Sequence, residues 1–207
     1  MDTDEACRSF QRNRSMALTE STMMLDLGTE APDFALRDVV TGTTVHRDDF
    51  QGKRGLLVMF ICAHCPYVKH LEKGLASLGE DYAGKPLGSV AISSNDAVMY
   101  PDDSPDRLKE QAQRLGFRFP YLYDETQAIA RAYKAACTPD FFLFDGDLKL
   151  VYRGQFDASR PGNRIPVSGD DLRAAIDAVL QGRPVSDDQR PSIGCNIKWK
   201  EPSLPRR

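Results

Sequence analysis

The chain has 207 residues, of which 41% are hydrophobic, and its acidic and basic side chains nearly balance to a formal net charge of −3. This length suits about one domain with a sizeable buried core. The sequence has no basic stripe of the kind that indicates nucleic-acid binding. It also has no apolar run approaching the roughly 18 residues that a membrane-spanning helix needs.

The two ends of the chain differ in composition from its middle. Residues 1–24 are polar and mixed in charge, without the apolar centre of a secretory signal, so we expect a flexible leader there. We expect one domain over residues 25–184 and an irregular tail, 185–207, that packs back on it. Five cysteines are present, with Cys7 in the leader as the leftover. The expected compartment is the cytoplasm, where clustered cysteines are more often catalytic, redox-sensing or metal-binding than structural.

The first half of the domain predicts extended segments followed by a helix. Residues 31–36 form a short extended piece, and residues 39–45, around Thr41-Gly42, form a small hairpin. Residues 55–61 are an uninterrupted apolar run, which is typical of a buried central strand. From Pro66 to about Ala83 apolar side chains recur at three- and four-residue spacing, which predicts a helix with one buried face.

The second half alternates strands and helices. Acidic residues and Ser104 before a helical pattern supply caps for a helix that Gly116 ends. An Asp-Gly turn between two runs of strand formers predicts a hairpin. The remaining elements are strand 87–93, strand 119–123, helix 126–136, strands 140–145 and 148–153, and helix 168–180. This alternation predicts an α/β fold with a mixed central β-sheet flanked by helices.

Two cysteines lie where the central strand gives way to the helix. Cys62 and Cys65 follow the apolar run, and Pro66 comes directly after Cys65. Proline is favoured at the first helical position, so Cys65 is predicted to cap the helix. A sulfur there faces unpaired backbone N–H groups and the positive end of the helix dipole, which stabilise the reactive thiolate. The sequence therefore predicts redox chemistry at sulfur.

Four blocks of sequence resemble one family of proteins. These are Gly28-Thr-Glu-Ala-Pro-Asp-Phe-Ala-Leu36, Phe60-Ile-Cys-Ala-His-Cys-Pro-Tyr-Val-Lys-His70, Thr138-Pro139, and Pro191-Ser-Ile-Gly-Cys-Asn-Ile-Lys-Trp-Lys200. Together and in this order they resemble the thioredoxin-like superfamily, in its peroxiredoxin-like (alkyl hydroperoxide reductase/thiol-specific antioxidant) branch. The resemblance implies a thioredoxin-like fold with an N-terminal β-hairpin extension.

The resemblance also assigns roles to single residues. An ungapped count from Phe60 puts Cys65 at the position of the thioredoxin nucleophile, and Lys69 matches a common thioredoxin lysine. Thr138 and Pro139 are similar to the cis-proline corner, whose backbone edge receives an extended substrate strand. Positive charge close to Cys65, from Lys69 and from His64 or His70, would favour its thiolate.

These observations predict a thiol–disulfide oxidoreductase of the thioredoxin-like type. Cys65 attacks, Cys62 is the first choice for the resolving thiol, Cys137 is the second, and Cys195 is a possible additional redox cysteine. His64, Pro66 and Lys69, with Thr138 and Pro139, complete the expected site. The expected partners are a protein or small-molecule thiol or disulfide and a reductase, without nucleic acid, membrane, cofactor or metal.

Two other functions compete with this prediction. A thiol-dependent peroxidase would use Cys65, but neither Cys62 nor Cys65 is preceded by the Pro-x-x-x-Thr/Ser-x-x-Cys pattern of peroxiredoxins. A non-catalytic module that binds a partner or a metal is the second alternative. Zinc favours about four ligands, and Cys62 and Cys65 would need completion by Cys137, His64, His70 or Cys195.

Overall fold

A computed structural model describes residues 18–201 of the chain, and its larger sheet has seven strands. Their order is β3-β2-β6-β5-β4-β8-β9, with parallel pairs at the centre and antiparallel pairs toward both edges. The strands are β2 Ala35–Asp38, β3 Thr44–His46, β4 Gly55–Phe60, β5 Leu87–Ser93, β6 Tyr121–Tyr123, β8 Asp140–Asp145 and β9 Leu150–Gly154. The predicted mixed sheet is confirmed, and the β2–β3 hairpin lies at its edge.

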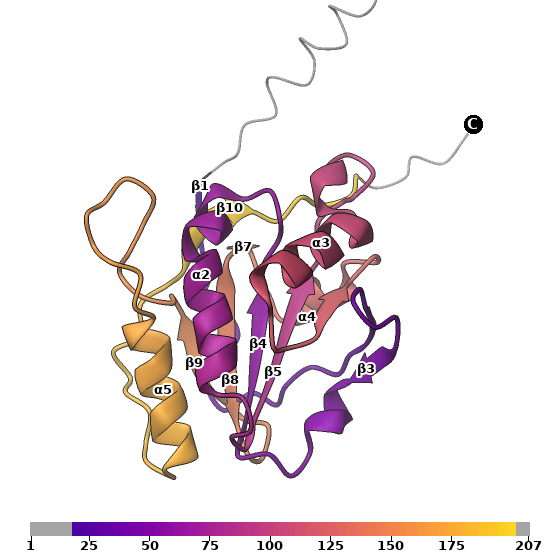
Figure 1. Cartoon of the computed structure of the whole chain (residues 1–207). Coiled ribbons are helices and arrows are strands. Elements are labelled where there is room, and N and C mark those ends of the chain that lie inside the picture. The colour runs from indigo at the N-terminus through magenta and orange to yellow at the C-terminus, as the bar shows by residue number, and fades with distance from the viewer. Residues whose placement is uncertain (1–17, 202–207) are drawn as a thin grey trace, which may run out of the picture.

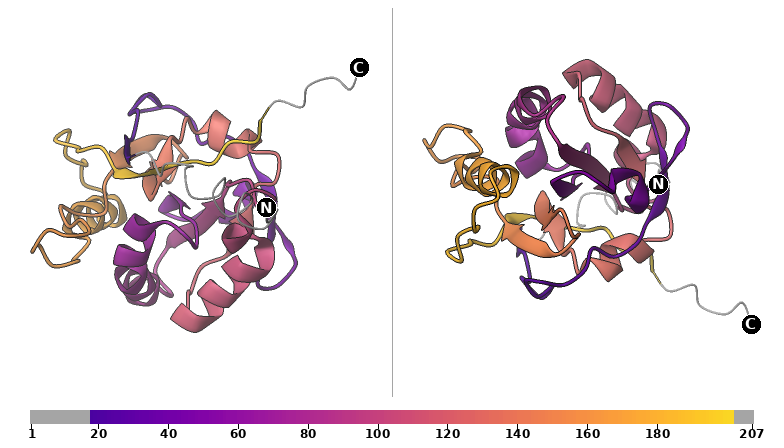
Figure 2. Two further views of the ribbon diagram at one scale, coloured as in Figure 1. Left: turned by 90° about the horizontal axis from the view of Figure 1, so that it is seen from above. Right: turned by 90° about the horizontal axis from the view of Figure 1, so that it is seen from below.

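Helices cover both faces of this sheet (Figures 1 and 2). The α-helices are α2 Pro66–Asp81, α3 Pro105–Leu115, α4 Ala128–Ala132 and α5 Asp170–Leu180, and two short 3-10 helices span Arg47–Phe50 and Pro101–Asp103. In the views along the sheet, α2, α3 and α5 lie on one side, and α4 lies on the other side with the C-terminal segment. The chain therefore has a layer of helices on each side of the strands.

The central strand β4 explains why both faces are covered. Its side chains alternate between the two faces, and all six of its residues are buried. Leu57 and Met59 join the core beneath α2, α3 and α5. Leu56, Val58 and Phe60 join a second core, which contains Ala130 of α4 and the aromatic ring of Tyr133. A strand buried on both faces must be apolar throughout, as residues 55–61 are.

A second, smaller sheet lies at one end of the domain. Its strands are β1 Leu18–Glu20, β10 Ile193–Asn196 and β7 Cys137–Thr138, in the order β1-β10-β7. β10 is the middle strand and runs antiparallel to both neighbours. Figure 1 shows this sheet beside the start of α2. Strands from the two ends of the described chain are thus brought to the strand–helix junction that carries Cys62 and Cys65.

The small sheet shows structure in parts of the two chain ends that the sequence predicts to be flexible or irregular. The segment expected to be a flexible leader up to residue 24 contains β1, because its backbone pairs with β10. The tail contains a strand that packs back on the domain, although Trp199 stays 36% exposed and lies against the guanidinium of Arg131. Cys7 lies outside the described residues. No helix within residues 18–201 has both the length and the apolar character to cross a membrane.

One predicted helix is shorter than expected. The alanine-rich pattern predicts a helix over residues 126–136, but α4 spans only Ala128–Ala132. Gln127 and Lys134 have positive φ angles of 63° and 53°, so the chain leaves helical geometry on either side. At the start of α4, the Asp124 carboxylate accepts hydrogen bonds from the Ile129 and Ala130 N–H groups. Local turns thus override the helix propensity of the alanines.

The close approach of β10 and β7 depends on Gly194. A Cβ atom added there would overlap the Thr138 carbonyl oxygen and lie 2.6 Å from its carbonyl carbon. We predict that Gly194→Ala lowers the free energy of unfolding by about 1–3 kcal/mol, as overpacking a tight site does. Urea unfolding measures the change. Gly146→Ala is the control, since a Cβ there meets no atom closer than 3.4 Å, and equal stability of both variants would contradict the prediction.

Candidate redox site

Cys65 occupies the position predicted for it at the start of α2. It is the N-cap residue, with an extended backbone, and Pro66 opens the helix. Lys69 N–H donates to the Cys65 carbonyl oxygen at 2.9 Å, which closes the first turn. Proline costs no hydrogen bond at this position, because the first helical N–H groups have no partner within the helix. The sequence Cys-Pro therefore fixes the sulfur beside the N–H groups of the first turn.

Three sulfurs meet around Thr138. The Cys65 Sγ lies 2.9 Å from the Cys195 Sγ and 3.2 Å from the Thr138 carbonyl oxygen. The Cys62 Sγ lies 3.3 Å from the Thr138 hydroxyl oxygen. The Thr138–Pro139 peptide bond is cis, as the resemblance implies. Cys62 and Cys65 have no exposed surface, and Cys195 is 3% exposed, so the three thiols form a buried cluster.

Charge is distributed unevenly within this cluster. Hydrogen bonds from the Cys195 and Cys62 thiols lower the pKa of Cys65 well below that of ordinary cysteine, and the Val68 and Cys195 N–H groups add to the effect. Burial raises the pKa of Cys62, and hydrogen bonding to Cys65 raises it further. The hydrogen bond to Cys65 and then burial raise the pKa of Cys195. Of the three sulfurs, Cys65 is therefore the one that ionises most readily.

Cys137 does not belong to this cluster. In the antiparallel pair of β7 and β10, Thr138 lies opposite Cys195, and Cys137 lies opposite Asn196. Side chains alternate along a strand, so Cys137 points to the other face from Cys195. Its Sγ donates to the Pro139 carbonyl oxygen at 3.6 Å, and burial raises its pKa. The expected second resolving thiol thus lies on the other face of the strand pair from the sulfurs that meet around Thr138.

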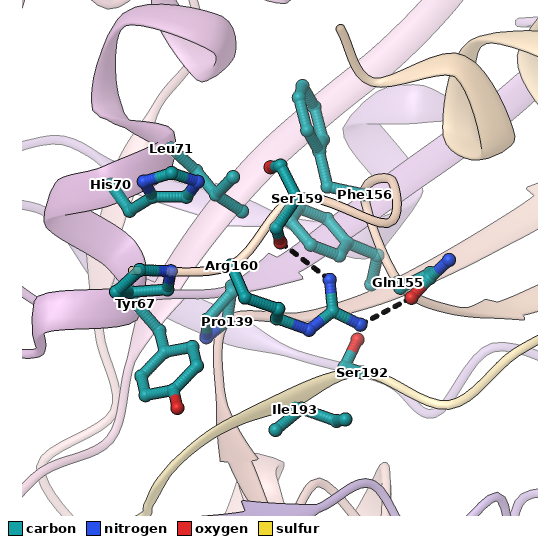
Figure 3. A pocket seen from close by; sticks show the side chains of 12 residues that line it. Tyr67, His70, Leu71, Pro139, Gln155, Phe156, Ser159, Arg160, Ser192 and Ile193 are labelled. Atoms are coloured by element: carbon teal, nitrogen blue, oxygen red, sulfur yellow. Dashed lines mark hydrogen bonds between the residues drawn. The ribbon is translucent and has the colours of Figure 1, made fainter. Parts of the chain in front are cut away.

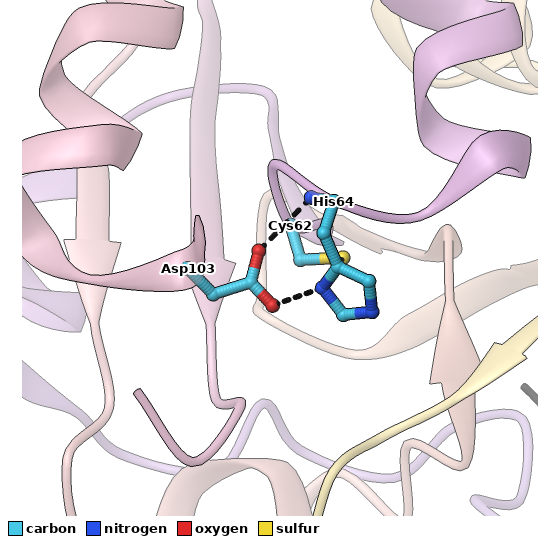
Figure 4. A group of neighbouring side chains, drawn as sticks. All are labelled: Cys62, His64 and Asp103. Carbon is cyan, nitrogen blue, oxygen red and sulfur yellow. Dashed lines mark hydrogen bonds and ion pairs between the residues drawn. The ribbon is translucent and has the colours of Figure 1, made fainter. Parts of the chain in front are cut away.

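Asp103 is a buried carboxylate that our sequence interpretation did not place in the site. Its oxygens accept hydrogen bonds from the Ala63 and His64 N–H groups at 2.8 and 3.0 Å and from the Asn95 side-chain amide at 2.7 Å. Figure 4 shows its second oxygen bonded to the His64 Nδ1. Asp103 fixes the two residues between Cys62 and Cys65, and its negative charge helps to raise the pKa of Cys62.

His64 therefore takes part in the site by bonding to the Asp103 carboxylate. Its Nδ1 also lies 3.9 Å from the Cys62 Sγ, and its ring stacks on Tyr100 at 5.6 Å between centroids. Cys62, His64 and Asp103 have the ligand types and the proximity to hold a metal ion. However, the Asp103 oxygens already accept four hydrogen bonds from the loop, His64 and Asn95. Binding a metal would replace several of these bonds, so the geometry fits an anchor better than a metal centre.

The sequence predicts that the charge of Lys69 favours the Cys65 thiolate, and the structure shows no such effect among the main causes of the lowered Cys65 pKa. Lys69 is exposed and lines a surface hollow with Glu72, Lys73 and Arg114. The effects that lower the pKa of Cys65 come instead from two thiols and two backbone N–H groups. The lysine points away because the helical periodicity puts Val68, and not its neighbour, on the buried face.

Comparison with known proteins agrees with this architecture. The AhpC/TSA family matches residues 27–153. The thiol-disulfide oxidoreductase ResA of Bacillus thuringiensis is 30% identical over 127 residues, which cover 61% of this chain and 68% of ResA. This chain belongs to the AhpC/TSA family. The predicted class, an oxidoreductase that acts on thiols and disulfides, is confirmed by the family and this relative.

Solved structures extend the comparison over nearly the whole chain. An uncharacterized conserved protein from Geobacillus kaustophilus is 55% identical, with a TM-score of 0.88 over 91% of this chain and 100% of that chain. A hypothetical protein from Sinorhizobium meliloti is 49% identical, with a TM-score of 0.86 over 88% and 98%. The thioredoxin domain of a Bacteroides vulgatus thiol-disulfide oxidoreductase, 19% identical over 72% and 96%, has a TM-score of 0.55. The predicted thioredoxin-like fold is confirmed.

The geometry around Asp103 predicts the effect of removing its charge. Asp103→Asn should lower the pKa of Cys62, since a negative neighbour is lost, and destabilise the fold by about 1–3 kcal/mol because buried partners lose their acceptor. Thiolate absorbance near 240 nm across pH reports the first effect, and urea unfolding the second. Asp102→Asn is the matched control, because Asp102 is exposed beside it. An unchanged Cys62 titration would contradict the assignment.

Proposed function

We propose that Cys65 is the attacking thiolate of this oxidoreductase and that Cys195 is its principal resolving thiol. The observation that carries the proposal is the 2.9 Å separation of the Cys65 and Cys195 Sγ atoms at the helix N-terminus. The Cys65 thiolate attacks a substrate disulfide, forms a mixed disulfide with one half and releases the other half as a thiolate. Cys195 then passes its proton to the released thiolate, directly or through water, and attacks the Cys65 sulfur, which forms the internal disulfide and releases the second half as a thiolate. Two electrons pass from the protein thiols to the substrate.

Cys62 has a supporting role in this proposal and an alternative one. Its thiol donates toward the Cys65 sulfur, which stabilises the thiolate before attack. It is also close enough in sequence, three residues away, to close a compact disulfide with Cys65 when Cys195 is absent. The sequence alone favoured Cys62 as resolving thiol, and the position of β10 favours Cys195.

A stabilised thiolate affects the redox balance of the pair. Because the low pKa of Cys65 stabilises its reduced form, we propose a reduction potential toward the oxidising end of thioredoxin-like proteins. A peroxidase that uses the same Cys65 is the competing proposal, and rapid turnover of hydrogen peroxide with a thiol would favour it. A cytoplasmic location stays a prediction.

Disulfide mapping tests which thiol resolves. After mild oxidation we expect a Cys65–Cys195 bond in the wild-type protein and a Cys62–Cys65 bond in Cys195→Ser. Cys137→Ser, at a buried thiol on the opposite face, is the control and should leave the map unchanged. Mass spectrometry of proteolytic fragments reads the pairing. A wild-type map with Cys62–Cys65 alone would return the resolving role to Cys62, and oxidation confined to Cys137 would contradict the whole scheme.

The ionisation of Cys65 gives a second test. Its pKa is lowered, so the thiolate persists as the pH falls from about 8.5, where an ordinary cysteine becomes protonated. We expect absorbance near 240 nm from one thiolate at pH 6 in the reduced protein and none in Cys65→Ser. Cys137→Ser is again the control and should keep the signal. Loss of the wild-type signal below about pH 8 would show that Cys65 is not activated.

A further inference from the structure

The Cys65 sulfur is closed off from solvent while β10 is in place. The Cys65 side chain has no exposed surface, and the Cys195 Sγ of β10 lies against its sulfur at 2.9 Å. A hollow between the first turn of α2 and the cis-proline has room for about one water molecule (Figure 3). A disulfide cannot enter through it. A substrate therefore reaches Cys65 only when β10 moves away, and the contacts that hold β10 decide how often that happens.

Asp140 lies where both outer strands of the small sheet meet the rest of the domain. It follows the cis-proline as the first residue of β8, and it has no exposed surface. Its carboxyl group accepts a hydrogen bond from the Ser21 hydroxyl at 3.0 Å, and the Ser192 hydroxyl is also within hydrogen-bond reach. Ser21 comes directly after β1, and Ser192 comes directly before β10. One buried carboxyl group thus contacts the ends of both β1 and β10.

The hydrogen bonds of the two serines indicate which form of Asp140 fits this place. The Ser21 N–H donates to the Ser192 carbonyl oxygen at 2.8 Å, and the Ser192 hydroxyl donates to the Gly154 carbonyl oxygen at 2.6 Å. A hydroxyl has one proton, so while Ser192 donates to Gly154 its oxygen can only accept a hydrogen bond from Asp140. Asp140 must then carry a proton. The contacts therefore fit a neutral carboxylic acid.

No positive side chain compensates a charge on Asp140. Within residues 18–201 no lysine, arginine or histidine forms an ion pair with it. The Arg160 guanidinium, which lines the hollow together with Ser192 (Figure 3), donates to two carbonyl oxygens and a glutamine side chain of its own loop. A buried carboxylate without a cation is costly. Burial accordingly raises the pKa of Asp140 to about 7, although hydrogen bonds from Ser21 and Ser192 oppose the rise.

The other titratable groups around Asp140 come from four elements. Cys137 of β7 and Tyr152 of β9 both have a pKa raised first by burial and further by the charge of Asp140, so they stay neutral near pH 7. Glu20 of β1 is exposed to solvent. His70 of α2 lines the same hollow. Histidine commonly titrates between pH 5 and 8, so a test at Asp140 must be separated from an effect of His70.

We propose that Asp140 is a positioning residue for the resolving step: its neutral carboxyl group holds β10 closed through Ser21 and Ser192, and its ionisation favours release of β10. This inference rests on the proposed function. With β10 open, the Cys65 sulfur attacks the substrate disulfide, bonds to one half and expels the other half as a thiolate. Closure of β10 returns Cys195 to the mixed disulfide. Cys195 then passes its proton to the released thiolate, directly or through water, attacks the Cys65 sulfur and expels the bound half as a thiolate.

The direction of the pH dependence follows from the burial of Asp140. An aspartate in water ionises near pH 3.9, whereas the pKa of Asp140 in the closed form is about 7. The closed form therefore binds this proton more tightly than the open form does, and its advantage is complete below about pH 4. The advantage declines as the pH rises to about 7 and is lost above that.

Hydrogen exchange of single backbone amides measures the opening of β10. Two amides have defined partners: the Ile197 N–H donates to the Ala136 carbonyl oxygen at 3.1 Å, and the Ser21 N–H donates to the Ser192 carbonyl oxygen. Exchange rates of the reduced protein are corrected for the intrinsic effect of pH. We expect the protection of both amides to fall at least about tenfold between pH 5 and pH 8. Equal protection at both pH values would overturn the proposal.

Variants assign this pH dependence to Asp140. Asp140→Asn keeps the shape of the side chain and stays neutral, so its protection should match the wild type at pH 5 and persist at pH 8. His70→Gln is the matched control and should keep the wild-type change. Ser192→Ala, a second variant, removes the oxygen that accepts the Asp140 proton, so the change should move to lower pH. A wild-type pH dependence that survives in both Asp140→Asn and Ser192→Ala would overturn the assignment.

The ratio of two internal disulfides connects the position of β10 to the redox function. Oxidised Cys65 bonds either to Cys195, with β10 closed, or to Cys62, which leaves Cys195 free. The two forms interconvert by exchange within the chain, so their ratio at equilibrium does not depend on the oxidant. Cys62 and Cys195 both have raised pKa values, so the free thiol stays protonated between pH 6 and 8.

Disulfide mapping at equilibrium gives this ratio. In the wild type we expect the share of Cys62–Cys65 to rise about threefold from pH 6 to pH 8, and in Asp140→Asn we expect it to stay constant. A constant share in the wild type would overturn the positioning role of Asp140. Cys62–Cys65 alone at every pH would instead overturn the resolving role of Cys195 in the proposed function, and hydrogen exchange would still report whether Asp140 holds β10.

Discussion

The pairing of β10 with β7 is the constraint on which the candidate site depends. It places Cys195 opposite Thr138 and so brings a sulfur from the end of the chain to the helix cap at Cys65. Side chains alternate along a strand, so a shift of one residue would turn Cys195 to the opposite face and present Gly194 or Asn196 instead. Gly194 permits this register because a side chain there would collide with Thr138. The close contact between Gly194 and Thr138 therefore determines that Cys195 is the third sulfur of the cluster.

The same arrangement decides which sulfur carries charge. All three thiols are buried, and burial alone disfavours every thiolate. Cys65 differs because it lies at the N-terminus of α2 and receives hydrogen bonds from both neighbours and from the backbone. Cys62 lies close to the negative Asp103, so its ionisation is opposed. Position in the fold, and not residue type, separates the attacking sulfur from the sulfurs that support it.

The sequence predicted those parts of the site that depend on short-range signals. Cys-Pro at the end of an apolar run identified the helix cap, and the resemblance to the thioredoxin-like superfamily implied the cis-proline corner at Thr138-Pro139. Asp103 was missed because it lies 39 residues from His64 and looks like an ordinary helix-capping residue in Asp-Asp-Ser-Pro. The pairing of β10 was missed because four residues between irregular segments carry no alternating pattern. Both depend on contacts between segments distant in the chain.

The redox centre is buried, which restricts the molecules that can reach the Cys65 sulfur. The strand that occupies the edge beside the cis-proline also carries Cys195, so the pairing of that edge and the position of the third thiol come from the same four residues. An open edge would require Cys195 to leave Cys65, which would remove both the resolving sulfur and a hydrogen bond that stabilises the thiolate. Substrate access along the edge and activation of Cys65 therefore oppose each other.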